Sequence, residues 1–198
     1  MSRTSNRADG DVVRDFLSVA DLLEEPQLAQ LYAYLARTDE ATVQAVMDEL
    51  ELAQGTAYSY VNRLVDAGVV EMTHDEQPRR YTAREIDLTV TTAAGDREYT
   101  ITPALIDAVG RRETDADIDT YIDRHGVAGV ATALTYAIGR ERGEVTHRLM
   151  ASDLDISPLA AEMILQALRP VVLEHYDIDE AGGSLDEVDI DDDAADET

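Results

Sequence analysis

A short stretch near residue 60 carries side chains that can form paired hydrogen bonds to nucleic-acid bases. If the stretch is helical, a turn of 100° per residue places Thr56, Ser59, Asn62 and Arg63 on one face. An Asn can bind adenine, and an Arg can bind guanine, through two hydrogen bonds each, whereas Ser and Thr are suited to phosphate or thymine-methyl contacts. This pattern predicts a surface that reads a base sequence.

Further polar residues extend the predicted contact surface. Gln54 opens the stretch, and Tyr58 and Tyr60 flank its polar face, where they are suited to phosphate or thymine-methyl contacts. Arg79 and Arg80 follow about one element later and are suited to phosphate contacts. The predicted DNA-contacting residues are therefore Gln54, Thr56, Tyr58, Ser59, Tyr60, Asn62, Arg63, Arg79 and Arg80.

Two alternative interpretations apply to these residues. The helix face can be an ordinary solvated surface, and the arginines 79, 80 and 84 can pair with the acids at 75, 76 and 85. Local charge argues against a merely solvated face. Residues 54–84 contain four acids and four Arg, whereas the whole chain has a formal net charge of -26. The segment therefore lacks the excess of acidic residues found in the rest of the protein, as expected of a surface that faces DNA.

Apolar residues at helical spacing indicate the elements that hold this stretch. Spacings of three and four from residue 16 to residue 35 predict a first helical region that passes Pro26. Thr42 is suited to cap a short second helix that ends near Leu50. After a break at residues 51–54, the stretch itself forms a third helix, with Gly68 at the position of a left-handed C-cap.

Strand-like segments follow the third helix. Residues 69–73 and 80–82 predict a hairpin with Pro78 near its tip, and residues 86–92 and 97–101 predict a second hairpin that turns at residues 94–96. Two helices joined by a tight turn and followed by a hairpin is the order of a winged helix-turn-helix. Residues 46–81 therefore predict that motif, with the polar face on its second helix.

The residues of this segment resemble a known group of proteins. The run Val46-Met47-Asp48-Glu49-Leu50, then Leu52, then residues 55–70 ending in Leu64-Val65-Asp66-Ala67-Gly68-Val69-Val70, is similar to transcription regulators of the MarR/ArsR/TrmB type. The resemblance covers roughly residues 26–81. It implies that the second of the two helices, residues 54–67, lies in the major groove of DNA and that the wing, residues 69–84, touches the neighbouring backbone.

The downstream half is predicted to be helical. Thr102 and Pro103 form an N-cap and first helical position for residues 104–111, and further helices are expected at residues 117–124, 127–140, 145–154 and 158–176. Residues 150–168 repeat the apolar spacing of residues 46–64 and look like a second helix-turn-helix. Because Glu162 and Gln166 point outward with little base nearby, a packing or dimer helix pair is favoured over a second DNA reader. We expect a homodimer through residues 127–140 and 158–176.

The amino-acid composition indicates what kind of protein this is and which functions to exclude. All sixteen basic residues are Arg and none is Lys, against 42 acids, a pattern that resembles proteins of halophilic archaea. In molar salt the Debye length is about 3 Å, so such a charge costs the fold little. The chain has no Cys, its four His residues lack metal-site spacing, and no catalytic or phosphate-loop motif is present. We expect no enzyme, no metal, no cofactor and no membrane span, in a cytoplasmic protein whose effector is unknown.

These observations predict a mainly α fold with a small β wing, in which an N-terminal winged helix-turn-helix precedes an α-helical domain. The expected division is a disordered lead at 1–11, a DNA-binding domain with an extra hairpin at 12–102, a helical dimerisation or sensing domain at 103–177 and an acidic disordered tail at 178–198. The expected function is a sequence-specific DNA-binding transcription regulator. The alternative is a winged-helix module that docks another protein, which a contiguous apolar patch on the third helix would favour.

Overall fold

The computed structural model describes residues 19–91 and 98–178 of the chain. The expected lead, the residues before Val19, the turn at residues 94–96 and all but the first residue of the expected tail lie outside these ranges. After a helical segment at residues 19–24, the elements are α2 (Pro26–Arg37), β1 (Ala41–Thr42), α3 (Val43–Leu50), α4 (Gln54–Ala67), β2 (Val70–His74), β3 (Arg80–Ala83), β4 (Leu88–Thr91), β5 (Glu98–Ile101), α5 (Pro103–Gly110), a 3₁₀ turn (Arg111–Glu113), α6 (Ala116–Glu141), α7 (His147–Leu154) and α8 (Pro158–His175).

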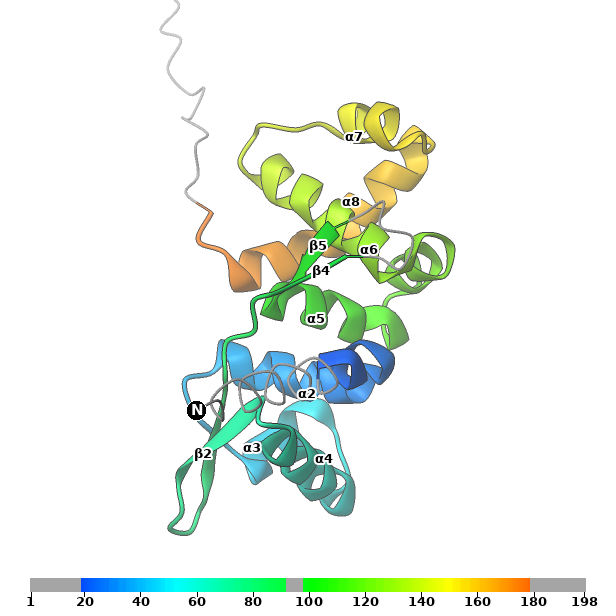
Figure 1. Cartoon of the computed structure of the whole chain (residues 1–198). Helices are drawn as coiled ribbons and strands as arrows, with labels where there is room; N and C mark the ends of the chain where they lie inside the picture. The colour runs from blue at the N-terminus through cyan, green and yellow to red at the C-terminus, as the bar shows by residue number, and fades with distance from the viewer. Residues whose placement is uncertain (1–18, 92–97, 179–198) are drawn as a thin grey trace, which may run out of the picture.

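The N-terminal half is the predicted winged helix-turn-helix (Figure 1). Thr42 caps α3 by accepting a hydrogen bond from the backbone N–H of Ala45. Gly68 ends α4 with φ 80°, in the left-handed region where a residue without Cβ is favoured. Strands β2 and β3 pair antiparallel as the wing, and the short β1 adds to β3, so that the sheet order is β1-β3-β2. The sequence predicted the two wing strands but not β1.

The first helical region differs from the prediction. Instead of one helix through residue 35, the chain breaks at Glu25, whose φ of -117° and ψ of 98° are extended, and α2 begins at Pro26. A proline has no backbone N–H to donate and disfavours helical geometry in the residue before it, so it suits the first position of a new helix. The break matters for the site described below, because Glu25 lies at this junction.

The downstream half is helical, as predicted. Thr102 caps α5 through the N–H of Leu105, and Pro103 is its first residue. Gly126, with φ 68° and ψ 179°, kinks α6, so the two helices expected on either side of it form one bent element. The strands β4 and β5 pair antiparallel as the predicted second hairpin. The fold class is therefore as predicted, mainly α with a small β wing and an α-helical region after the winged helix.

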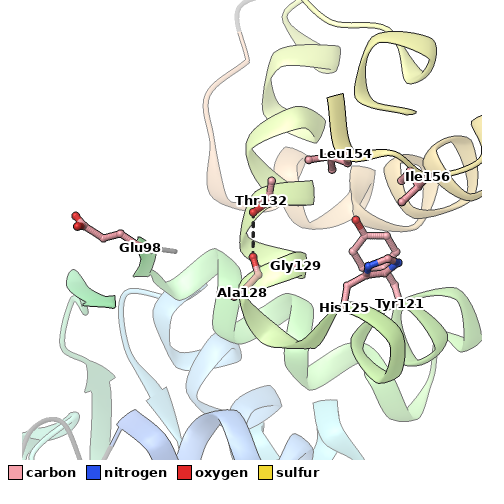
Figure 2. A pocket seen from close by; sticks show the side chains of 8 residues that line it. All are labelled: Glu98, Tyr121, His125, Ala128, Gly129, Thr132, Leu154 and Ile156. Carbon is pink, nitrogen blue, oxygen red and sulfur yellow. Dashed lines mark hydrogen bonds between the residues drawn. The ribbon is translucent and has the colours of Figure 1, made fainter. Parts of the chain in front are cut away.

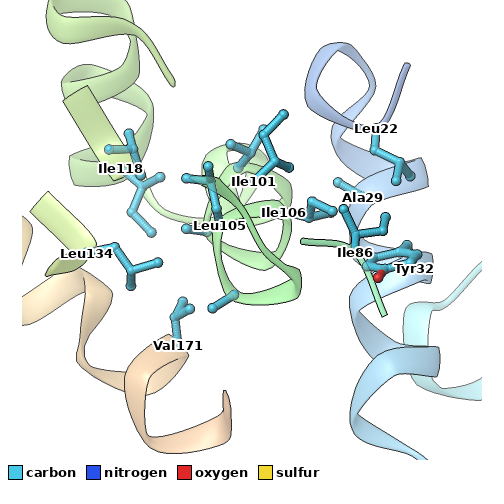
Figure 3. Close-up of a cluster of buried hydrophobic side chains, with 14 of the residues drawn as sticks. Leu22, Ala29, Tyr32, Ile86, Ile101, Leu105, Ile106, Ile118, Leu134 and Val171 are labelled. Atoms are coloured by element: carbon cyan, nitrogen blue, oxygen red, sulfur yellow. The ribbon is translucent and has the colours of Figure 1, made fainter. Parts of the chain in front are cut away.

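Helix α5 connects the two halves. Figure 3 shows Leu105 and Ile106 of α5 between Ala29 and Tyr32 of α2 on one side and Leu134 of α6 on the other. All of these side chains belong to one cluster of buried apolar residues. As a result, α4 and the wing lie at one end of the molecule and α7 lies at the other (Figure 1).

A polar cluster also ties the halves together. Asp107 of α5 is only 3% exposed, yet it accepts hydrogen bonds from Arg37 of α2 at 2.5 Å and from Arg111 at 3.0 Å, and it contacts His175 of α8 at 2.8 Å. Burial by itself raises the pKa of Asp107, but the hydrogen bonds from His175 and Arg111 and the charges of Arg111 and Arg37 outweigh burial and hold that pKa well below its usual range. The Asp107 carboxylate is therefore ionised, and the groups around it balance its negative charge.

In the described part of the chain, no single helix combines the length and apolar character that crossing a membrane requires, and only the sharply bent pair of α7 and α8 meets that test when the two are taken together.

Candidate nucleic-acid interface

The turn between α3 and α4 sets the orientation of the predicted reading helix. Glu51 ends α3 in the left-handed region, with φ 51°, and the N–H of Leu52 returns to the carbonyl of Met47 at 3.2 Å. Helix α4 then buries Ala57, Val61 and Leu64, which are at most 1% exposed. Burial of this face directs the opposite face of α4 to solvent.

The solvent face of α4 is polar, and it is uncharged from Gln54 to Asn62, after which the exposed Arg63 and Asp66 follow. Gln54, Gly55, Tyr58, Ser59 and Asn62 are exposed, and none of them carries an acid or a base. Tyr58, at 47% exposure, is the one large hydrophobic side chain exposed on α4. The face therefore offers amide and hydroxyl groups for hydrogen bonds and no contiguous apolar patch.

Three of the predicted residues lie nearer the buried face of α4 or on its flank. Thr56 is only partly exposed, and the hydroxyl of Tyr60 donates to the side-chain oxygen of Gln27 at 3.3 Å. Arg63 binds two acids near the start of α2, donating to the carboxylate of Glu25 and, through Nη2, to Asp21 at 3.1 Å. These hydrogen bonds raise the pKa of Arg63. In the free protein Arg63 is thus held against the helix junction at Glu25.

The arginines of the wing are also paired. Arg79 lies 3.4 Å from Asp75, as the alternative interpretation expected, and Arg80 lies 3.8 Å from Glu40. Each of the two Arg side chains is about half exposed.

Arg84, the remaining arginine of this segment, donates its Nε to Glu71 across the wing at 3.1 Å. All four arginines between residues 54 and 84 therefore have an acidic partner. A phosphate that binds any of them therefore binds beside a carboxylate or in place of one.

The sequence analysis did not predict three of the acids that bind these arginines. Asp21, Glu25 and Glu40 lie 38 to 42 residues away from the arginines they bind. In a chain with 42 acids, no local pattern marks these three. The tertiary fold alone brings them to the site.

A cavity of about 410 Å³ lies in the helical half (Figure 2). The rings of Tyr121 and His125, whose centroids are 4.4 Å apart, line one side, and Glu98 lies on the other. Its lining includes Gly129 and Thr132 of α6, just after the kink at Gly126. Across the described residues, no group of three His, Asp or Glu side chains is arranged to hold a metal ion.

Comparisons with known proteins divide the chain in the same way as the fold. Residues 28–87 match the family model of the sugar-specific transcriptional regulator TrmB. That range begins in α2 and ends just after the wing, so the winged-helix half is similar to a family of transcription regulators. Residues 112–177, which include α6, α7 and α8, match a family of unknown function (DUF7437). No curated protein and no solved structure matched the chain.

Proposed function

We propose that this chain is a transcription regulator that binds double-stranded DNA in a sequence-specific manner. In this proposal α4 enters the major groove and the wing, residues 69–84, contacts the neighbouring backbone. The observation that carries the proposal is the solvent face of α4, which from Gln54 to Asn62 is uncharged and rich in hydrogen-bonding groups in a protein of net charge -26. The family match over residues 28–87 supports the same class of function.

The residues have different proposed roles. Ser59 and Asn62, which are exposed at the centre of the outward face, would contact base edges, and Gln54 and Tyr58 beside them would contact phosphates, bases or thymine methyl groups. Arg63 would contact guanine or phosphate only after leaving Glu25 and Asp21.

Four further contacts complete the proposed set. Thr56 and Tyr60 would contact the backbone at the edge of the groove, and Arg79 and Arg80 would contact phosphates from the wing. Contacts with the DNA backbone position the protein on the duplex and carry no information about the base sequence.

The remaining parts of the chain receive supporting roles in this proposal. Residues 12–102 form the DNA-binding unit, and residues 103–177 form a helical unit that dimerises or senses an effector. The cavity beside Tyr121 and His125 is a candidate place for an effector to act, because it lies at the kink of α6 and α6 packs on α5. The chain has no Lys and a large excess of acidic residues. This composition supports a protein that works in a cytoplasm near salt saturation, as in halophilic archaea.

The proposal is tested by genome-wide occupancy mapping in the native host, followed by titration of an enriched site with purified protein in multimolar KCl. Discrete sites that share one sequence, bound more tightly than scrambled DNA of the same composition, are expected. A protein that binds matched and scrambled DNA equally, or neither, would overturn it and favour a winged-helix module that docks protein.

A further inference from the structure

Two glycines shape the cavity at the kink of α6. Gly126 has φ 68° and ψ 179°, a backbone conformation that is essentially open to glycine alone. At this kink the chain brings His125 so close to Gly129 that a Cβ added at Gly129 would lie only 2.4 Å from the Cβ of His125. A larger residue at either position would therefore strain the bend that forms the cavity.

An aromatic surface forms one side of this cavity. The rings of Tyr121 and His125 belong to the segment of α6 before the kink, and their planes are inclined by 36° to each other. Tyr121 is buried and His125 is partly exposed. Figure 2 shows both rings at the cavity, together with Ala128 and Thr132 from the segment of α6 after the kink. Paired rings of this kind can stack on a flat ring system.

The turn between α7 and α8 supplies an apolar wall. Leu154 and Ile156 line the cavity on either side of Asp155, which ends α7 in the left-handed region with φ 52°. The turn after α3 has the same backbone form, because Glu51 ends that helix with φ 51°. The cavity therefore lies between an aromatic pair and two aliphatic side chains that a defined turn holds in place.

The charges around the cavity disfavour an anionic ligand. None of its described lining residues is an arginine, and the chain has no lysine. The one carboxylate among the lining residues belongs to Glu98. Arg124 lines a separate hollow of about 70 Å³ that also borders the two rings. A phosphate or carboxylate group in the main cavity would therefore lose water without gaining a guanidinium partner.

We propose that this cavity binds a small, flat ring molecule that carries no negative charge. Its volume of about 410 Å³ lies in the range of small-molecule sites. The aromatic pair would stack on the ligand, and the apolar turn would cover its other surface. The imidazole of His125 offers a hydrogen bond to a polar edge of the ring. The hydroxyl of Thr132 donates to the carbonyl of Ala128 at 3.0 Å, so its oxygen is able to accept a second hydrogen bond from the ligand.

Direct contacts give this site a route to α4. The segment of α6 that carries the rings is bound to the 3₁₀ turn before it, because Arg112 of that turn lies 2.8 Å from Asp119 and 3.1 Å from Asp123. The 3₁₀ turn packs on α2, and α2 begins after Glu25, which holds Arg63. A ligand that shifts this segment of α6 therefore changes how Arg63 is held. The ligand site stands by itself, and only this control of DNA binding rests on the proposed function.

Three compounds that share one ring test the site: indole is neutral, tryptamine is a cation and indole-3-acetate is an anion. The chain has no Trp, so the fluorescence of the probe is distinct from that of the protein. Fluorescence anisotropy with the full chain in multimolar KCl should give dissociation constants of about 1 mM or lower for indole and tryptamine, and binding of indole-3-acetate should be at least about threefold weaker.

Variants locate the bound ring. Ala128→Leu fills the cavity from a partly exposed position and should abolish binding. The matched control is Ala116→Leu, the same change at an exposed position at the start of α6, which should bind as the wild type does. No binding of indole or tryptamine at about 10 mM, equal binding of the anion, or equal binding by both variants would overturn the proposal.

Titration of labelled target DNA with and without saturating tryptamine tests the route to α4. Tryptamine should change the affinity of the wild type for DNA at least about fivefold, and it should have no effect on Ala128→Leu, which controls for direct effects of the probe on DNA. Arg112→Ala should still bind tryptamine but lose most of its effect on DNA. Arg142→Ala, which removes the same charge from an exposed position just after α6, should keep that effect.

The outcomes separate the two proposals. Tryptamine binding by a protein that does not bind DNA would refute the proposed function alone. DNA binding by a protein that binds no ring would refute this inference alone. An unchanged affinity for DNA when tryptamine is bound, or an effect that persists in Arg112→Ala, would overturn the route through the 3₁₀ turn.

Discussion

Replacing Glu25 with Gln should strengthen DNA binding by releasing Arg63. Arg63 is the one basic side chain of α4, and in the free protein it donates to Glu25 and Asp21. A phosphate or guanine can bind this guanidinium only after the carboxylates are displaced. Glu25→Gln keeps the size of the side chain, removes its charge and therefore lowers the cost of that displacement.

The size of the effect follows from exposure. The Arg63 side chain is 42% exposed and that of Glu25 is 34% exposed, so water already screens the pair. Ion pairs of this kind contribute about 0.2–1 kcal/mol, which corresponds to a gain in affinity of about 1.5- to 5-fold. In multimolar salt, where the Debye length is about 3 Å, the gain should fall toward the lower value.

Fluorescence anisotropy with labelled target DNA at several KCl concentrations measures the gain. Glu24→Gln is the matched control, because Glu24 is exposed, lies one residue away and has no ion-pair partner among the described residues. The same comparison in an Arg63→Ala background isolates the pair, since Glu25→Gln should then add nothing. Equal gains from Glu24→Gln and Glu25→Gln would mean that net charge alone controls affinity. A loss of affinity in Glu25→Gln would mean that Glu25 positions Arg63 for DNA and does not restrain it.

Three further outcomes are expected. Asn62→Ala should lose about 1–3 kcal/mol of discrimination between matched and scrambled DNA, whereas Arg80→Ala should weaken both DNAs about equally in the same titrations. Binding of the wild type should persist into molar KCl, because added cations screen the repulsion between DNA and a protein of net charge -26; a steep fall in affinity with salt would contradict this. Asp107→Asn should cost about 3–5 kcal/mol of unfolding free energy near neutral pH, since it removes a buried charge that three partners compensate. Because the folded pKa of Asp107 is depressed, its contribution is present above the unfolded-state value of about 4 and is lost as pH falls below it, so wild type and variant should converge in denaturant titrations at acidic pH.

The sequence predicted those elements whose signals are local. Thr42, Gly68 and Thr102 act at helix ends as their types suggest, because capping depends on residues within one turn. The interruption of α6 at Gly126 was anticipated as a gap between two helices. The break at Glu25 was not, although Pro26 carried the signal for it.

Contacts between distant segments were beyond sequence reasoning. Strand β1 exists only because Ala41 pairs with Tyr81, and the cluster around Asp107 joins residues of three helices. The same limit applied to the site. Helical periodicity placed Ser59 and Asn62 outward, but it could not show that the acids near the start of α2 hold Arg63.

The specificity of a variant with an altered α4 surface tests the central claim most directly. Ser59→Ala, Asn62→Ala and Arg63→Ala combined leave the buried face of α4 unchanged, so the fold should be retained and can be verified by circular dichroism. The ratio of affinities for the native target and for scrambled DNA should then fall to nearly one, while weak binding to both remains. An unchanged ratio in a folded triple variant would show that α4 does not read the DNA sequence.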